Sequence, residues 1–428
     1  MRGARPLRRL CAQSRPAGRH GQAQPSRGNL LSTARLAALL VGLILPVSGM
    51  AFSPALAGPA PADAPGGPVS LRVLPPISQP GARATSADKA KVVLITRVKP
   101  RRAAAVRLQV RTSSGWRTIK KARTDSKGTY VFRAALRRGK GAATYRVRSG
   151  GNASSPVSTT RWLTPSFSDS FGGRKLKKAW THRGTSYNPA VRRCSRADKR
   201  ATKVGGGVLR LSVMKDPKRK KKCVAASNGV FGKYVYRLNG HVGTQESYTF
   251  TYGVAAARVK FPRQSGQHGA FWLQVDSPDL RKVNAKRNGT EMDVVESYGA
   301  DMGAAEKSLG LGTGVHRYVK RNGQFTTVSD GGYVKNAAQY LSGRNDSFWG
   351  RYHVFSVEWT PRYYIYRIDG KEYWRTHKGI SGTPQFPILS NLSSDYELGR
   401  LKNGDKDLPQ HMKVDWLRVW ETGPGAKR

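Results

Sequence analysis

The alternation of apolar and polar residues in residues 166–422 constrains the fold more than any other feature. Runs such as Tyr248–Lys260 and Met412–Trp420 alternate or stay apolar, and glycine and Asn/Asp turns divide them. Successive side chains of a strand point to opposite faces, so this pattern predicts strands. Asp369-Gly370 is a strong hairpin signal. Since no helical period persists, we predict one all-β sandwich domain over residues 166–422.

Two segments precede this domain. Residues 58–90 are rich in Ala, Pro, Gly and Ser, which predicts a flexible linker. Residues 91–160 contain short, evenly spaced β runs between turns, which predicts a small Ig-like β-sandwich module. We expect Trp116 in the core of that module. The module would act as a spacer or would bind glycan or cell wall.

The N-terminal residues 1–57 have the order of a secretory signal. An Arg-rich leader without acidic residues is followed by the apolar stretch 36–46 and by Ala55-Leu56-Ala57, a small-x-small cleavage site. The apolar stretch is too short and too broken by Pro and Gly for a membrane span. We therefore predict a signal peptide with a long basic leader, and a secreted, extracellular protein without a membrane span.

Three cysteines bear on the compartment and on metal binding. Cys11 lies in the predicted leader, so the exported chain retains only Cys194 and Cys223. In an exported protein this pair predicts one disulfide, and two free thiols are the alternative. No CxxC or Cys/His cluster suggests zinc, and we predict no metal at the functional site.

The charge of the chain is strongly positive, with 76 Lys and Arg against 25 Asp and Glu. Such a field favours polyanions, although a merely solvated basic surface is the alternative. Cations do not alternate with aromatic residues as in a groove for single-stranded nucleic acid, so we expect no nucleic-acid partner. The run Lys218–Lys222 before Cys223 predicts an exposed loop tip, which could contact an anionic cell wall or glycan.

The acidic residues concentrate in the second half of the chain, and three stand close together: Glu291, Asp293 and Glu296. Alternation on a strand places Glu291 and Asp293 on one face and Glu296 on the other. A one-residue β-bulge would return Glu296 to the first face and leave Val294 and Val295 packed inward. We predict this bulge.

Two carboxylates on one face suit glycoside hydrolysis with retention, which needs them about 5–5.5 Å apart. One must be ionised to attack the anomeric carbon, and the other must be protonated to release the leaving oxygen. The Asp between them can hydrogen-bond the nucleophile and separate the two pKa values. An exposed acidic strand and a metal site are the alternatives.

Four segments resemble glycoside hydrolase family 16. Thr290–Glu296 resembles its ExDxxE signature, in the bulged variant of laminarinase-like members. Gly269–Leu273 resembles its AFWL strand, Tyr352–Pro361 its EWTP segment and Val414–Trp420 its closing strand. These segments occur in the family's order.

The resemblance implies a concanavalin-A-like β-jelly-roll with the glycan on its concave sheet. It implies that Glu291 is the nucleophile, Glu296 the acid/base and Asp293 the auxiliary acid. Trp272 would stack on a sugar or pack in the core, and His316 would contact substrate or be an ordinary surface histidine.

The resemblance also bears on cofactors. We expect that none is required. Asp415 matches a position near a structural Ca²⁺ in some members, so such an ion is possible.

The expected activity is that of a secreted retaining endo-glycosidase, acting as a monomer on a β-linked polysaccharide, most simply endo-β-1,3-glucan. Basic loops, including Asp276–Asn288, make an anionic glycan such as a sulfated galactan or hyaluronan an alternative. A transglycosylase and a non-catalytic lectin-like protein are the others.

Overall fold

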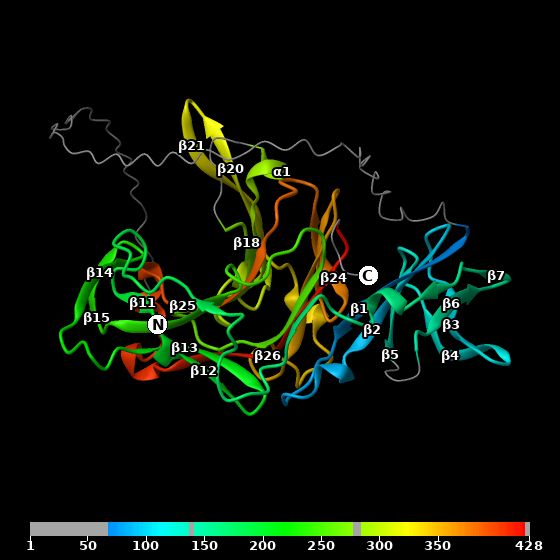
Figure 1. Ribbon diagram of the computed structural model, residues 1–428, viewed down its shortest axis with the longest axis horizontal. Helices are drawn as coiled ribbons and strands as arrows, with labels where there is room; N and C mark the ends of the chain where they lie inside the picture. The colour runs from blue at the N-terminus through cyan, green and yellow to red at the C-terminus, as the bar shows by residue number, and fades with distance from the viewer. Residues whose placement is uncertain (1–66, 137–140, 277–283, 424–428) are drawn as a thin grey trace, which may run out of the picture. The chain divides into compact units, whose positions relative to one another are not determined.

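The computed structural model describes residues 67–136, 141–276 and 284–423, and strands dominate all three ranges (Figure 1). The predicted signal peptide, residues 1–57, lies outside the described residues. Among the described residues, no helix is long and apolar enough to span a membrane.

The first part of the described chain is a two-sheet module. Its strands are β1 Val69–Ser78, β2 Lys91–Val98, β3 Ala105–Thr112, β4 Gly115–Arg123, β5 Thr129–Ala135, β6 Thr144–Ser149, β7 Asn152–Ala153 and β8 Val157–Ser158. One sheet has the order β1-β2-β5, and the other has the order β4-β3-β6-β7 with β8 beside β6. Leu94, Leu108 and Phe132 lie in their shared buried core. The Ig-like assignment of this module stays a prediction.

Two expectations for this region are wrong. The flexible linker expected over residues 58–90 is contradicted from Val69 on, because Val69–Ser78 pairs as β1 with β2, and residues 58–66 lie outside the described residues. Prolines within β1 interrupt the alternation of apolar residues that would otherwise have predicted it. Trp116 lies outside the module's core, half-buried, with the guanidinium carbon of Arg146 4.4 Å from its ring centre.

The second part holds the remaining strands. They are β9 Phe167–Asp169, β10 Thr181–His182, β11 Ser195–Ala197, β12 Thr202–Gly205, β13 Val208–Lys215, β14 Cys223–Ser227, β15 Val230–Tyr234, β16 Arg237–Gly243, β17 Gly253–Lys260, β18 His268–Gln274, β19 Glu291–Ser297, β20 Leu311–Arg321, β21 Gln324–Tyr333, β22 His353–Trp359, β23 Tyr364–Ile368, β24 Lys371–Thr376, β25 Phe386–Leu392 and β26 Gln410–Glu421. The α-helix of this part is α1, Ala285–Asn288, and a 3₁₀ helix, η6, covers Asp395–Arg400.

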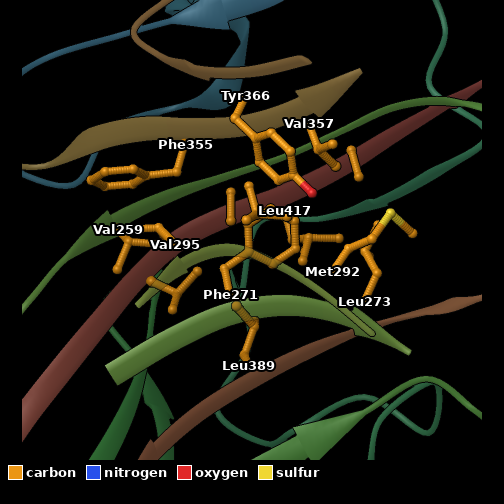
Figure 2. Close-up of a cluster of buried hydrophobic side chains, with 14 of the residues drawn as sticks. Val259, Phe271, Leu273, Met292, Val295, Phe355, Val357, Tyr366, Leu389 and Leu417 are labelled. Carbon is orange, nitrogen blue, oxygen red and sulfur yellow. The ribbon is translucent and has the colours of Figure 1, made fainter. Parts of the chain in front are cut away.

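These strands form one long sheet folded over its own core. Its main order is β21-β20-β19-β18-β25-β16-β13-β26-β17-β22-β23-β24, and β14 pairs separately with β15. Phe271 and Met292 from β18 and β19 share a buried cluster with Phe355 and Leu417 from β22 and β26 (Figure 2). Apolar side chains of both halves are thereby removed from water. The predicted all-β jelly-roll sandwich is confirmed.

The two-sheet module shares a buried apolar cluster with the sandwich. Leu74 and Ile77 of β1 pack there with Trp416 and Trp420 of β26. The cluster lies on the outer side of β26, away from the core between the sandwich layers, since alternate residues of a strand face opposite ways. The module is therefore packed against the sandwich rather than tethered to it.

The predicted disulfide is confirmed. Cys194 and Cys223 are bonded, with a Cα–Cα distance of 5.6 Å, and both are buried. The bond joins the start of β14 to the segment before β11.

Candidate active site

The predicted bulge is present in β19. Asp293 lies opposite Trp272 of β18, whereas Val295 lies opposite the next residue, Phe271, so Val294 is the extra residue. On the other side, Asp293 pairs with Gly314 and Glu296 with Gly312 of β20. Val294 and Val295 are both fully buried in the sandwich core, as expected.

The bulge is stabilised by side-chain hydroxyls that donate hydrogen bonds to two of its backbone carbonyls. Tyr373 Oη donates to the carbonyl of Val294, and Thr313 Oγ1 donates to the carbonyl of Asp293 at 2.9 Å. A buried carbonyl without a donor would cost about 1–3 kcal/mol. These two side chains therefore allow the extra residue to persist in a buried strand.

Two glycines of β20 leave space for the acidic side chains. A Cβ on Gly312 would lie 3.7 Å from Glu296 Oε2, and a Cβ on Gly314 would lie 3.6 Å from Asp293 Oδ2 and 3.3 Å from His316 Nε2. Without those Cβ atoms, the carboxylates and the imidazole lie against bare backbone.

Glu291 is held by a hydrogen bond from Gln274. Gln274 Nε2 donates to Glu291 Oε2 at 2.9 Å, and Arg183 donates to Gln274 Oε1 at 3.2 Å. Burial and then the charge of Asp293 raise the pKa of Glu291 to about 7, against the lowering effect of His316. Such a carboxyl changes its protonation state near neutral pH.

Asp293 is paired with His316, so the structure brings these two predicted residues together. His316 Nε2 lies 2.7 Å from Asp293 Oδ2, and its Nδ1 lies 2.7 Å from Ser329 Oγ. Burial and the charge of Glu296 raise the pKa of Asp293 to about 6. The hydrogen bond to Asp293 raises the pKa of His316 to about 9, with the charges of all three acids acting the same way. His316 is thus a cation among three carboxyl groups.

Glu296 lies beside an aromatic and a cationic side chain. It shares a hydrogen bond with Tyr298, whose pKa is raised by burial and by the Glu296 charge. His268 Nδ1 lies 2.9 Å from Glu397 Oε1. Burial opposes protonation of His268, but Glu397 and, less strongly, Glu296 outweigh it and raise the pKa of His268 to about 9.

Trp272 lies on the face of β18 that carries Gln274, not in the sandwich core. It is half-buried, its Nε1 donates to Ser390 Oγ at 3.1 Å, and its ring lies 5.9 Å from that of His241. Its role in substrate binding stays a prediction, but packing in the core is not the alternative.

The profile of the glycosyl hydrolases family 16 matches residues 203–418, which is just over half of the chain. The matched residues include the bulged strand. The chain belongs to glycoside hydrolase family 16.

Individual relatives are distant. The glucan endo-1,3-beta-glucosidase A1 of Niallia circulans is 23% identical over 203 residues, 44% of this chain and 27% of that protein. A beta-glucanase of Rhodothermus marinus is 21% identical over 245 residues, 54% of this chain and 74% of that protein. The match thus spans only about a quarter of the first relative's length.

The solved structures that match this chain are also distant from it in sequence. The endo-beta-1,3-glucanase of Pyrococcus furiosus is 21% identical and matches 60% of this chain and 93% of its own, with a TM-score of 0.43. A kappa-carrageenase of Zobellia galactanivorans is 20% identical over the same shares, with a TM-score of 0.44.

Sequence reasoning missed several residues of this family 16 site. Gln274 of β18 reaches Glu291, Arg183 after β10 reaches Gln274, and Tyr298 follows β19 directly. The sequence could have predicted Gln274, because it is two residues after Trp272 and therefore lies on the same strand face. Arg183 lies over a hundred residues from the motif, and no local pattern marks it.

Two positions could concern a metal ion. Glu291, Asp293 and His316 each offer one atom within 4.8 Å of the others, a spacing that a cation could use. However, the imidazole already pairs with Asp293. Asp415 is engaged by protein groups: the buried Arg258 guanidinium forms an ion pair with it, and the Thr85 amide lies 3.3 Å from its oxygens. The arginine supplies the positive charge at that carboxylate, and a structural Ca²⁺ stays a prediction.

Proposed function

We propose that this protein is a secreted, retaining endo-hydrolase of a β-linked polysaccharide, with β-1,3-glucan as its first candidate substrate. The observation that carries the proposal is the bulge of β19, which puts Glu291, Asp293 and Glu296 on one sheet face, where the charges of all three act on His316. The disulfide supports export, because such bonds persist in oxidising compartments.

In the proposed first step, ionised Glu291 attacks the anomeric carbon while Glu296 donates a proton to the leaving glycosidic oxygen. The bond from the anomeric carbon to that oxygen breaks as the bond to Glu291 forms. In the second step Glu296 accepts a proton from water, which displaces Glu291 and leaves the configuration retained. The chain's own residues suffice for both steps, so we expect activity without an added cofactor.

Asp293 and His316 act on the charge of the nucleophile. The negative charge of Asp293 raises the pKa of Glu291, and the positive charge of His316 lowers it. The 2.7 Å contact holds the imidazolium beside the carboxylates, where it limits their mutual repulsion. The hydrogen bond expected between Asp293 and the nucleophile stays a prediction.

Release of reducing ends from laminarin tests the proposal. Glu291→Gln and Glu296→Gln should each reduce the rate at least about a thousandfold while keeping the far-UV spectrum of the parent. Glu246→Gln, at an exposed carboxylate, is the control and should retain full activity. Undiminished hydrolysis by Glu291→Gln would overturn the assignment, and binding of glycan without any product would favour a lectin-like protein.

An anionic glycan is the second candidate substrate, favoured by cations near the site. Arg183 reaches the Glu291 partner Gln274, and His268 and His316 lie beside the carboxylates. Initial rates on laminarin, carrageenan and hyaluronan discriminate between the candidates. The chain lengths of the products separate a hydrolase from a transglycosylase, because the latter lengthens some chains.

A further inference from the structure

The hairpin of β14 and β15 carries apolar side chains that no described residue covers. Val224, Val230 and Phe231 are 51%, 69% and 74% exposed. Large exposed apolar groups that lie together mark sites of interaction. The five cations Lys218–Lys222 immediately precede this hairpin and are all exposed.

The strand register places Val224 and Phe231 on one face, whereas Val230 pairs with Ser227 on the other. Val224 pairs with Lys233 and Ala226 with Phe231, whereas the neighbouring pairs of Cys223 and Ala225 face the buried side. The outward face therefore presents an aromatic ring and a valine between Lys233 and the basic run. We call Lys218–Lys222 together with this outward face the basic hairpin surface.

The lysines of the basic hairpin surface lack carboxylate partners among the described residues. Asp216 lies just before the run, but it accepts from the Lys218 amide at 3.0 Å and lies 3.5 Å from Arg200. Arg219 stacks over the rings of Tyr187 and Tyr236. The sequence holds no acidic residue between Asp216 and Glu246.

The basic hairpin surface is fixed to the rest of the sandwich. The disulfide attaches its first strand to Cys194. At the other end, Ser227 Oγ donates to the Tyr396 carbonyl at 3.0 Å and accepts from the Gly399 amide at 3.1 Å, both in η6. A binding surface held in this way loses little conformational freedom when a ligand binds.

The same helix connects the hairpin to the candidate active site. Tyr396 Oη lies 3.5 Å from His268 Nδ1, and the charge of Glu296 acts on both side chains. The hairpin, labelled β14 and β15 in Figure 1, is thus linked through η6 to His268 of the candidate active site. A polymer bound along the site could extend over it.

We propose that the basic hairpin surface binds an anionic polysaccharide, with its lysines on sulfate or carboxylate groups and Phe231 against a sugar face. Charge complementarity argues for a polyanion, and the connection to the site argues for a glycan. The single aromatic ring does not make the stacked platform that single-stranded nucleic acid uses. Binding here requires no chemistry at Glu291, so the proposal goes beyond the proposed hydrolysis.

The test measures binding of the full chain to chondroitin sulfate as a function of salt. The combined variant Lys218→Gln, Lys220→Gln, Lys221→Gln and Lys222→Gln should bind at least about tenfold more weakly at low salt, with a shallower salt dependence. Phe231→Ala should weaken binding about threefold with an unchanged salt slope. Laminarin hydrolysis by the lysine variant should equal that of the parent, because laminarin carries no charge for these lysines to bind.

A charge-matched control removes four exposed lysines of the two-sheet module: Lys89, Lys99, Lys121 and Lys127, each to Gln. It should change the affinity less than about twofold. An equal loss in this control, or unchanged binding by the first variant, would overturn the proposal. So would binding to phosphatidylglycerol vesicles that depends on the same lysines when binding to chondroitin sulfate does not.

Failure of the proposed hydrolysis can be distinguished from failure of the proposed polyanion binding. If no glycan is cleaved by any of these proteins, the proposed function fails, whereas the surface is still judged by the loss of polyanion binding. Melting temperature and an intact disulfide in each variant show that the hairpin is folded.

Discussion

At the scale of single residues, the ionisation of the carboxyl groups of the site depends on His316. It pairs with Asp293 and also lowers the pKa of Glu291, whereas burial and the charge of Asp293 raise that pKa. This interaction makes the ionisation of Glu291 sensitive to a side chain on the neighbouring strand.

The pH dependence of kcat/KM tests this interaction. Glu291 must lose its proton to attack, so activity should rise as the pH passes through about 7, the raised pKa of Glu291. His316→Asn removes a cation that lowers this pKa, so the acid limb should move to higher pH. His377→Asn, at an exposed histidine, should leave the limb in place. A limb that stays fixed or moves to lower pH in His316→Asn would contradict this account.

A second residue prediction concerns Gly314. A Cβ there would lie 3.3 Å from His316 Nε2, so Gly314→Val should displace the imidazole and reduce kcat/KM about tenfold or more. Gly205→Ala is the control, because a Cβ there meets nothing within 4 Å. Parallel rate and melting measurements check this, and a fully active Gly314→Val would mean that the space is not needed.

The residues of the motif were predictable, and their partners were not. Three acids in six residues, with two valines between them, can share a face only through a bulge, and β19 has it. The hydroxyls that stabilise it, Thr313 and Tyr373, come from β20 and β24, and only the folded sheet brings them together. The pairing of His316 with Asp293 likewise follows from strand register rather than from local sequence.

At the scale of elements, the disulfide fixes the segment that leads into β14. The two cysteines are 29 residues apart, and closing a loop of this length contributes about 3–4 kcal/mol in the chain-entropy account. The pairing was predictable because only two cysteines follow the predicted leader. The contact of the hairpin with η6 was not, because Ser227 and Tyr396 are far apart in sequence.

We therefore predict that replacing both Cys194 and Cys223 by Ala lowers the free energy of unfolding by about 3 kcal/mol. Urea denaturation followed by tryptophan fluorescence measures this. Reduction of the parent protein should lower its midpoint similarly. An unchanged midpoint in both experiments would mean that the bond does not constrain the unfolded chain.

At the scale of the whole molecule, the two-sheet module and the sandwich share a buried interface that the sequence pattern did not predict. Proline and glycine in residues 58–90 favoured a linker, yet Leu74 and Ile77 bury against Trp416 and Trp420. The alternate faces of β26 serve two cores: Leu417 and Val419 pack in the sandwich core, whereas Trp416 and Trp420 pack with the two-sheet module.

The ion pair of Arg258 and Asp415 lies at this interface. Arg258 also donates to the carbonyls of Gln79 and Arg83. Asp415→Asn would leave a buried guanidinium without its counter-charge and should lower the free energy of unfolding by about 3–5 kcal/mol. Asp88→Asn, at a partly exposed partner of Arg418, should cost less than about 1 kcal/mol. Equal effects in chemical denaturation would contradict a special role for the buried pair.

Covalent trapping of the nucleophile tests the central claim most directly. The protein is incubated with an activated 2-deoxy-2-fluoro laminaribioside, which slows the second step so that the glycosyl-enzyme accumulates, and its peptides are then mapped by mass spectrometry. We predict one disaccharide attached to Glu291, and none on Glu291→Gln. A label on Asp293 or Glu296, or turnover of laminarin with inversion at the anomeric carbon, would contradict the proposed mechanism.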